Sequence, residues 1–517
     1  MKTSTKQSGT QEEVFAFLMG FTTDPPVSRI DTHAATVFLA GPRALKIKRA
    51  VRFPFLDYST LAKRKAACEA EMTVNRPFAP QIYRRVVPIT RTDDGSLRLD
   101  GNGAPVEYAV EMARFDERQT IDRLAEAGLP NADLACEIAD AIARSHAEAV
   151  RVPAEPWITS IPALITGNTA AFRDVAGIRS EAIDQLDAAS RSAFLRIRNL
   201  LEKRGRQGFV RHCHGDLHLG NIVLIDGKPV LFDAIEFDPA MASIDVLYDL
   251  AFPIMEFLHY EHQTVANELL NRYLALTPAE NCDALAVLPL LMSMRAAIRA
   301  KVRYDRVAQD CDDKAVAARS ARAYFELALQ LIHPRGPKLV AIGGLSGTGK
   351  SVMARALAAG IEPQPGAVVL RSDITRKQLF QASETDRLPP NAYQPKVTKQ
   401  VYEVLAQRAG QLLAQGHSVV VDAVFARTSE RTAFCDVARA QNVPFTGLFL
   451  VAELATRMKR VTQRQSDASD ATRETVRQQE GYNIGTVDWA RIDASGTPEQ
   501  TLENGNTELA RQQPGSG

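Results

Sequence analysis

One run of residues constrains the fold of this chain more than any other, because it joins a glycine-rich turn to a strand before it and a helix after it. The run is LVAIGGLSGTGKSVMARAL, which contains the pattern G-x-x-x-x-G-K-S from Gly344 to Ser351. The apolar residues before the pattern predict a buried strand, and the alanine-rich residues after it predict a helix. This order is typical of the P-loop in α/β proteins.

The residue types in this pattern suit the binding of a nucleoside triphosphate. Glycines let backbone N–H groups turn toward a phosphate, and the following helix N-terminus adds its positive dipole. Lys350 is expected to reach the β- and γ-phosphate oxygens, and Ser351 to be a ligand of Mg²⁺. We therefore predict ATP and Mg²⁺ as cofactors, and the predicted binding residues are Gly344, Ser346, Gly347, Thr348, Gly349, Lys350 and Ser351.

Further apolar runs follow at the spacing of a parallel sheet that is covered on both faces. AVVLR, SVVVDAVF and FTGLFLV are short and are separated by helical stretches, which favours buried strands in a mainly parallel sheet. Asp422 ends the second of these strands, a position suited to a carboxylate that orients Mg²⁺ or its water. We predict a P-loop domain at 339–509 and a flexible tail at 510–517.

Two polar residues after the strand AVVLR suggest a reactive group beside the phosphates. Asp373 and Arg376 are three residues apart, so on one helical turn they share a face. This D-x-x-R after a P-loop resembles small-molecule and polynucleotide 5′-hydroxyl kinases of the P-loop class. The resemblance implies that Asp373 is catalytic and activates the acceptor hydroxyl, while Arg376 holds phosphate. The alternative is a solvated ion pair at a helix start.

Basic residues gather in the later segment RMKRVTQRQSDASDA. Arg457, Arg460 and Arg464 lie at spacings of three and four, so they share a helix face and could close over a transferred phosphate. This looks like the lid of such kinases, and an ordinary basic helix face is the alternative. We include Arg460 and Arg464 among the predicted nucleotide-binding residues.

The first half of the chain predicts a small sheet-rich lobe followed by a larger helical lobe. The run THAATVFLAGPRALKIKRAV predicts a hairpin around Gly41-Pro42, YSTLAKRKAACEAEMTVNRPF predicts a helix, and RVVPI, SLRLD and VEYAVEM predict strands. Residues 131–200 and 255–330 predict helices, which HPRGPK then interrupts. The predicted limits are an N-terminal segment at 1–30, a domain at 31–332 and a linker at 333–338.

The strongest signal in the first half is the run HGDLHLGNIVLIDGKPVLFD. A three-residue hairpin loop at 226–228 would pair residue 225 with 229, and hence Asn221 with Asp233. An amide oxygen and a carboxylate that face each other suit Mg²⁺. Asp216 precedes Asn221 at the D-x-x-x-x-N spacing of a kinase catalytic loop, in which the Asp accepts the proton of the substrate hydroxyl.

HGDLHLGN followed by LFDAIEF resembles the aminoglycoside phosphotransferase and choline-kinase-like branch of the protein-kinase fold. The resemblance implies a bilobal α+β domain in which Asp216 is the catalytic base and Asn221 and Asp233 are metal ligands. Two features depart from the kinase pattern, since no G-x-G-x-x-G loop precedes the strand lysine and DAIEF replaces DFG. The residues to which the resemblance gives a shaping or structural role are His214, His218 and Asp249.

A kinase also needs a strand lysine near the phosphates and a helix carboxylate that holds it. ALKIKR and CEAEM supply both kinds of residue. Lys46 and Lys48 project from one face of the strand, because side chains repeat every two residues. Glu69 and Glu71 are equally close rivals for the partner. We favour Lys46 with Glu71, and Lys46, Lys48 and Glu71 are the predicted nucleotide-binding residues of this half.

Charge and cysteine content limit the partners of the chain. A formal net charge of +1 provides no overall field toward nucleic acid or an anionic membrane. The six cysteines lack C-x-x-C spacing, which argues against a disulfide scaffold and a zinc site. No apolar run approaches the roughly 20 residues that span a bilayer, so we expect a cytoplasmic protein.

The function that these patterns predict is an ATP-dependent phosphotransferase with two nucleotide sites, whose N-terminal site phosphorylates a hydroxyl of a small molecule. The fusion of an aminoglycoside-phosphotransferase-like domain to a P-loop ATPase domain of the AAA type resembles a bacterial family of poorly defined substrate. Three alternatives remain. The first is a nucleotide-binding but catalytically silent N-terminal domain, and the second is a regulatory protein in which one site senses ATP. The third, a polynucleotide kinase in the P-loop half, is disfavoured by the near-neutral charge.

Overall fold

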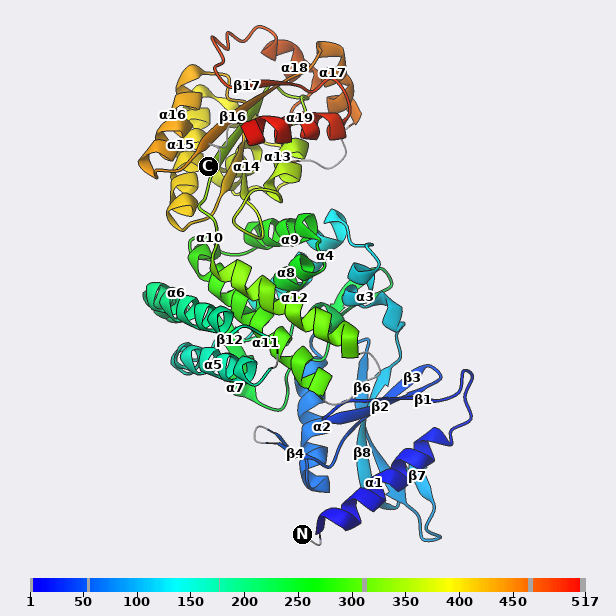
Figure 1. The fold of residues 1–517 in the computed structure, drawn as a ribbon. Helices are drawn as coiled ribbons and strands as arrows, with labels where there is room; N and C mark the ends of the chain where they lie inside the picture. The colour runs from blue at the N-terminus through cyan, green and yellow to red at the C-terminus, as the bar shows by residue number, and fades with distance from the viewer. Residues whose placement is uncertain (1–2, 54–55, 176, 309–313, 464–467, 512–517) are drawn as a thin grey trace. The chain divides into compact units, whose positions relative to one another are not determined.

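The computed structural model describes residues 3–53, 56–175, 177–308, 314–463 and 468–511 (Figure 1). The chain forms two compact units. The first unit consists of residues 1–130, 137–164 and 198–256, and the second of residues 131–136, 165–197 and 257–517. The predicted linker at 333–338 lies within the second unit, and the limits 31–332 and 339–509 stay predictions.

A six-stranded antiparallel sheet dominates the first unit, with the strand order β1-β2-β3-β8-β6-β7. The predicted hairpin around Gly41-Pro42 is confirmed, because Ala40 pairs with Arg43 across that turn. The three further predicted strands are also present. The strands are β1 Ser28–Asp31, β2 Ala35–Ala40, β3 Arg43–Lys48, β6 Tyr83–Arg91, β7 Leu97–Leu99 and β8 Ala104–Ala113, and a small pair is formed by β4 Arg52–Phe53 and β5 Leu56–Asp57.

Helices cover both faces of this sheet. On one face α1, Thr3–Met19, packs Val14 and Leu18 against Phe38 and Ile47. This helix lies in the predicted N-terminal segment at 1–30, for which the sequence analysis predicts no helix. On the other face lies the predicted helix α2, Leu61–Asn75, whose N-cap is Thr60. Since β3 alternates, α1 meets the face with Ile47 and α2 meets the face with the lysines.

Short strands and helices carry the rest of the first unit. The hairpin β10–β11 packs Val223 and Val230 against the α2 side of the sheet, and β9 pairs antiparallel with β12. The bounds are α3 Ile121–Glu126, β9 Val210–His212, β10 Ile222–Ile225, β11 Lys228–Leu231, α7 Pro239–Ala242 and β12 Ser243–Asp245, with 3₁₀ turns at Glu117–Gln119 and Leu219–Asn221.

The predicted helical stretches at 131–200 and 255–330 are confirmed. Two of the long helices, α11 and α12, pack closely, and Ser293 Oγ donates to Ala328 O at 2.8 Å between them. The helices are α4 Ala132–Glu148, α5 Glu155–Arg173, α6 Ser180–Arg206, α8 Val246–His259, α9 Gln263–Leu276, α10 Ala279–Cys282, α11 Leu288–Ala308 and α12 Lys314–Ile332, with a 3₁₀ turn at Leu285–Val287.

A five-stranded parallel sheet forms the centre of the C-terminal part of the second unit, with the order β14-β15-β13-β16-β17. Val420, Leu448 and Ile342 belong to its buried core. The predicted fold class, an α+β kinase-type unit and an α/β P-loop region, is confirmed by these two sheets. The strands are β13 Leu339–Gly344, β14 Val368–Arg371, β15 Val419–Asp422, β16 Phe445–Val451 and β17 Ala490–Asp493.

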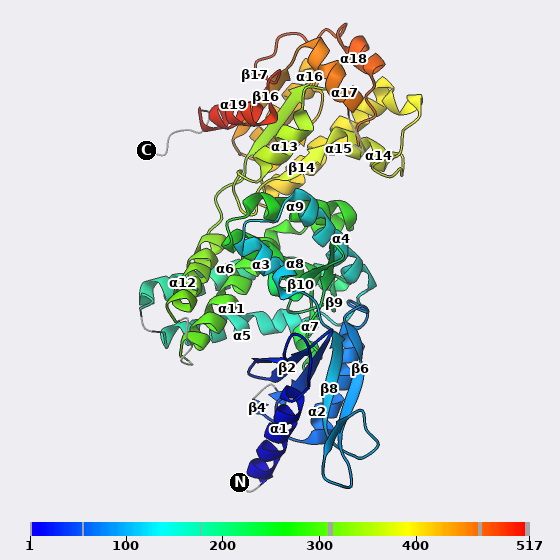
Figure 2. The ribbon, with the colours of Figure 1, turned by 90° about the vertical axis from the view of Figure 1, so that its right-hand side faces the viewer.

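Helices alternate with these strands (Figure 2). The edge strand β14 is also bound by α9 within the same unit, where Asn271 Oδ1 accepts from Val369 N at 2.8 Å and Asn267 Nδ2 donates to Ala367 O at 3.0 Å. The helices are α13 Lys350–Ala358, α14 Ser372–Leu379, α15 Pro395–Ala414, α16 Thr428–Ala440, α17 Leu454–Gln463, α18 Arg473–Gln479 and α19 Pro498–Arg511, with a 3₁₀ turn at Pro390–Tyr393.

The last helix, α19, extends through Arg511 into the predicted flexible tail at 510–517. Residues 512–517 lie outside the described part of the chain. In the ranges that the structure describes, none of the helices combines the length and the apolar composition required to cross a lipid bilayer.

Candidate active sites

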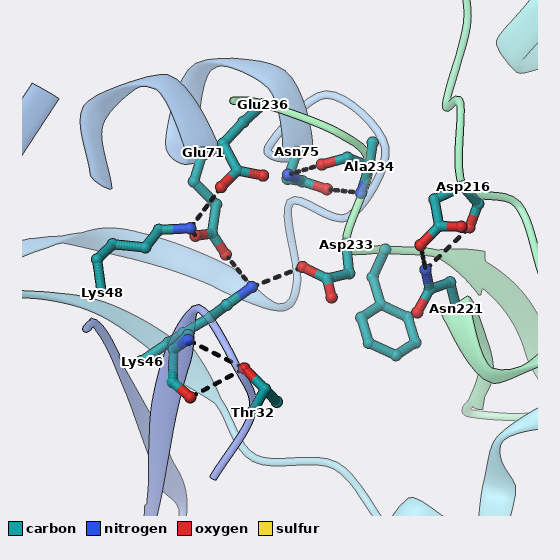
Figure 3. Close-up of polar contacts among 12 residues, drawn as sticks. Thr32, Lys46, Lys48, Glu71, Asn75, Asp216, Asn221, Asp233, Ala234 and Glu236 are labelled. Atoms are coloured by element: carbon teal, nitrogen blue, oxygen red, sulfur yellow. Dashed lines mark hydrogen bonds and ion pairs between the residues drawn. The ribbon is translucent and has the colours of Figure 1, made fainter. Parts of the chain in front are cut away.

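The first candidate site is built around the two lysines of β3. Lys46 Nζ lies 2.9 Å from Glu71 Oε1 and 2.6 Å from Asp233 Oδ1, as Figure 3 shows. Lys48 Nζ lies 2.5 Å from Glu71 Oε2 and 2.5 Å from Glu236 Oε1. Glu71 therefore contacts both lysines, whereas its rival Glu69 lies 3.7 Å from the exposed Lys65.

The charges of this cluster support one another despite their burial. Burial alone would raise the pKa of Glu71, but the ammonium groups of Lys46 and Lys48 outweigh it and lower that pKa. Burial would lower the pKa of Lys46, yet the carboxylates of Asp233 and Glu71 raise it well above its usual range. The pKa of Asp233 falls to about 2, because the Lys46 ammonium outweighs the effect of burial. All of these side chains are therefore ionised at neutral pH.

The hairpin that leads to Asp233 differs from the sequence prediction by one residue. Ile225 pairs with Lys228, and Ile222 with Leu231, so the loop holds two residues rather than three. Asp226 and Gly227 both have positive φ, of 50° and 74°, which is the requirement of a type I′ turn. The predicted pairing of Asn221 with Asp233 is therefore wrong.

Asn221 instead lies in register with the residue before Asp233, since Phe232 N donates to Asn221 O at 3.0 Å. Asn221 Nδ2 donates to Asp216 O at 2.9 Å and lies 3.4 Å from Asp216 Oδ2. This bond turns the amide nitrogen toward Asp216 and leaves the amide oxygen as the acceptor end of the side chain. The structure thus brings Asp216 and Asn221 together (Figure 3).

The loop that carries Asp216 is held by a buried carboxylate. Asp249 accepts hydrogen bonds from His214 N at 3.2 Å and from Gly215 N at 3.0 Å, and it lies 3.2 Å from His146 Nε2. His214 Nε2 lies 2.8 Å from Phe232 O, which joins this loop to the hairpin. The structure places His218 Nε2 3.7 Å from Asp216 Oδ2.

The second candidate site lies at the carboxyl end of the parallel sheet. Gly349 is the N-cap of α13 with a φ of 94°, so the P-loop ends in a left-handed residue that glycine adopts without strain. Ser351 Oγ donates to Asp422 Oδ2 at 2.6 Å, and Lys350 Nζ donates to Leu345 O at 3.2 Å across the loop. The predicted Ser351 and Asp422 are thus adjacent.

Arg371 joins this pair and was not predicted. It lies in register with Asp422 on the neighbouring strand, its Nη2 donates to Ser351 Oγ at 3.2 Å, and its Nε lies 3.4 Å from Asp422 Oδ2. Its place at the end of VVLR could have signalled this, because the carboxyl ends of parallel strands meet at one edge of the sheet.

Asp373 lies in the first turn of α14, within electrostatic reach of Asp422, Arg371 and Lys350. Burial and the neighbouring charge of Asp422 raise its pKa, against the opposing charges of Arg371 and Lys350. Arg376 points elsewhere, because its Nη1 donates to Ala392 O at 2.6 Å. Its guanidinium also lies over the Tyr393 ring, 5.0 Å from the centroid.

The arginines of α17 contact the P-loop itself. Arg457 Nε donates to Ser346 O at 2.9 Å, and Arg460 donates to Ala494 O at 2.7 Å and reaches Thr348 O at 3.4 Å. Arg464 lies outside the described residues. The predicted shared face of Arg457 and Arg460 therefore lies along the phosphate loop.

Gln479 of α18 was missed by sequence reasoning. Its Oε1 accepts from Ser346 N at 2.7 Å, and its Nε2 donates to Ser346 Oγ at 3.0 Å. Nothing in the local sequence could have singled it out, because the pairing joins residues 133 positions apart. Together with Arg457, Gln479 engages every polar group of Ser346.

Known proteins resemble the chain in whole and in part. Uncharacterized proteins of Mycobacterium bovis and Mycobacterium tuberculosis are 27% identical over 493 residues, which cover 93% of this chain and 95% of theirs. A choline/ethanolamine kinase family protein from Mesorhizobium loti aligns by structure with 62% of this chain and 99% of its own, at 15% identity and a TM-score of 0.37.

A gluconokinase from Sinorhizobium meliloti aligns with 34% of this chain and 94% of its own, at 19% identity and a TM-score of 0.25. The family model described as an AAA domain matches residues 339–482. This range begins at the strand before the P-loop and includes Asp373, Asp422 and Gln479. The second unit of the chain therefore carries an AAA domain with a P-loop.

Proposed function

We propose that the chain is an ATP-dependent phosphotransferase with two nucleotide sites, and that the first unit transfers the γ-phosphoryl group to a hydroxyl of a small molecule. The observation that supports this most strongly is the contact of Lys46 with both Glu71 and Asp233. These three residues come from a strand, a helix and the segment after a hairpin. Their convergence supplies the strand lysine, its helix carboxylate and the metal carboxylate that kinases combine.

The side chains near Asp216 suit Mg²⁺ bound to ATP. Asn221 and Asp233 offer an amide oxygen and a carboxylate, which are hard ligands of the kind that Mg²⁺ takes in proteins. The metal would neutralise charge on the β- and γ-phosphates, and Lys46 would bind phosphate oxygens. Asp216, whose side chain is 44% exposed, is then the group that accepts the proton of the acceptor hydroxyl.

The P-loop region would act as a second kinase-type module. Lys350 and the N-terminus of α13 would bind phosphate, and Ser351 with Asp422 would hold Mg²⁺. Asp373 lies close enough to Asp422 for their charges to interact, and in this proposal it orients an acceptor hydroxyl beside the phosphates. Arg376 would take up phosphate only after leaving its bond to the Ala392 carbonyl.

The test is transfer of labelled phosphate from γ-labelled ATP to the compounds of a metabolite extract. We expect labelled product with the natural chain and a fall of about 10²–10⁴-fold in that product with Asp216→Asn, the usual contribution of a general base. Lys350→Ala should leave that product unchanged. Hydrolysis of ATP without labelled product, or equal labelling by Asp216→Asn, would contradict the proposal and favour a regulatory role.

A further inference from the structure

The charged cluster of the first unit contains more groups than a kinase site needs. Two ammonium groups, of Lys46 and Lys48, meet three carboxylates, of Glu71, Asp233 and Glu236. One lysine and two carboxylates suffice for the arrangement of strand lysine, helix glutamate and metal aspartate. Lys48 and Glu236 therefore form an additional ion pair beyond that arrangement.

Lys48 is poorly placed to bind a nucleotide. Its side chain is 3% exposed, against 13% for Lys46, and its Nζ lies at 2.5 Å from a carboxylate on each of two sides. Figure 3 shows Lys46 pointing to Asp233 and Lys48 pointing to Glu236, with Glu71 between them. Glu236 also accepts from Tyr58 Oη at 3.3 Å, so its carboxylate is enclosed by partners.

The backbone around Glu236 is tied down residue by residue. Asp233 N donates to Tyr83 Oη at 3.2 Å. Ala234 N donates to Asn75 Oδ1 at 2.6 Å, and Ala234 O accepts from Asn75 Nδ2 at 3.1 Å. Ile235 N donates to His214 O at 3.1 Å. Glu236 is held through its side chain by Lys48, so each of the four residues 233–236 has a contact that fixes its position.

Asp233 itself needs this support, because its φ of 61° places it in the left-handed region. A non-glycine residue holds that conformation only where its surroundings impose it. The bonds of Ala234 to Asn75 act next to Asp233, and the Lys48–Glu236 pair acts at the far end of the same segment.

We infer that Lys48 and Glu236 are positioning residues whose ion pair anchors segment 233–236 to β3 and thereby holds the Asp233 carboxylate in place for the metal. This inference rests on the proposed function of the first unit. Glu71 links the two pairs, since it contacts both lysines. Segment 233–236 is consequently bound to β3 at both ends, by the ion pair of Asp233 with Lys46 and by that of Glu236 with Lys48.

The test measures Mn²⁺ binding by electron paramagnetic resonance in the presence of a non-hydrolysable ATP analogue. The full chain carries Lys350→Ala, which removes the phosphate-binding lysine of the P-loop and leaves the first unit as the site observed. Glu236→Ala should weaken Mn²⁺ binding about 10-fold or more, as the loss of groups that orient metal ligands usually does. Glu236→Gln keeps the size of the side chain and one acceptor oxygen, so its Mn²⁺ affinity should lie between those of the parent and of Glu236→Ala.

Matched variants separate positioning from folding. Glu69→Gln removes an exposed carboxylate of α2, the helix that carries Glu71, and should leave Mn²⁺ binding unchanged. Lys48→Met combined with Glu236→Ala removes one charge of each sign, so that Lys46 still pairs with Glu71 and Asp233. If the pair acts as a unit, this double variant should bind Mn²⁺ no more weakly than Glu236→Ala alone.

The outcomes distinguish the inference from the function on which it rests. If the Lys350→Ala parent binds no Mn²⁺ with the analogue, the proposed function of the first unit fails. If the parent binds and Glu236→Ala binds with the same affinity, the positioning role is wrong. Fewer binding sites of unchanged affinity would also overturn it, because that result indicates partial unfolding rather than a displaced carboxylate.

Discussion

The two candidate sites bring their functional groups together by different means. The P-loop is contiguous, so residues 344–351 owe their arrangement to local backbone geometry and to the start of one helix. The site of the first unit joins Lys46 to Asp233, 187 positions later in the chain, by ion pairs that exist only in the folded state. A phosphate cradle made of backbone tolerates side-chain changes nearby, whereas a cluster of buried charges depends on every member.

The largest difference should appear when Glu71 loses its charge. Glu71→Gln leaves Lys46 and Lys48 without the carboxylate that they share, and breaking a buried pair costs about 3–5 kcal/mol. Urea unfolding should show a destabilised transition for the first unit and an unchanged one for the P-loop region. Glu69→Gln is the control, since an exposed pair contributes about 0–1 kcal/mol. If Glu69→Gln destabilised the first unit as much as Glu71→Gln, the first unit would not depend on its buried charges.

Replacing an aspartate by asparagine should change the melting temperature in opposite directions at the two sites. The pKa of Asp233 is lowered to about 2, so its stabilising effect is present above the unfolded pKa of about 4 and is lost as the pH falls toward 2. The pKa of Asp373 is raised, so its ionisation opposes folding above its unfolded pKa. At pH 7, Asp233→Asn should lower the melting temperature and Asp373→Asn should raise it.

Melting curves at a series of pH values check this contrast. The gain from Asp373→Asn should shrink as the pH falls from 7 toward 4, because the natural carboxyl then takes up its proton in the folded state. A loss of stability with both substitutions at pH 7 would show that the Asp373 carboxylate is paired rather than repelled.

A smaller effect should follow from Gln479→Ala in the P-loop region. The substitution removes two hydrogen bonds to Ser346, with a net cost of about 1 kcal/mol. Hydrogen exchange at the Ser346 amide should accelerate, while the first unit is unaffected. Gln478→Ala is the matched control, since that exposed side chain donates to Glu474 on its own helix. Unchanged exchange would mean that Gln479 does not hold the loop.

The sequence predicted what depends on local order. The P-loop, the strand before it and the helix after it follow from one run of residues, as does the hairpin at Gly41-Pro42. The D-x-x-x-x-N spacing likewise marked Asp216 and Asn221, which the structure brings together. Each of these signals lies within about one supersecondary motif, where spacing and turn chemistry are informative.

The sequence could not predict what depends on distant contacts. The two-residue turn at Asp226-Gly227 differs from the predicted three-residue loop, because Lys228 belongs to the strand and pairs with Ile225. Glu236 and Gln479 gave no signal, since their partners Lys48 and Ser346 lie far away in the chain. The α1 helix was missed because its contribution lies in packing against the sheet, which tertiary contact rather than local pattern determines.

The most direct test of two separate nucleotide sites is the number of non-hydrolysable ATP analogues bound per chain, measured by equilibrium dialysis with Mg²⁺. The natural chain should bind two, Lys350→Ala and Lys46→Ala should each bind one, and the double variant should bind none. The residual site in each single variant should keep its original affinity. One analogue per natural chain, or loss of both from a single substitution, would contradict the account.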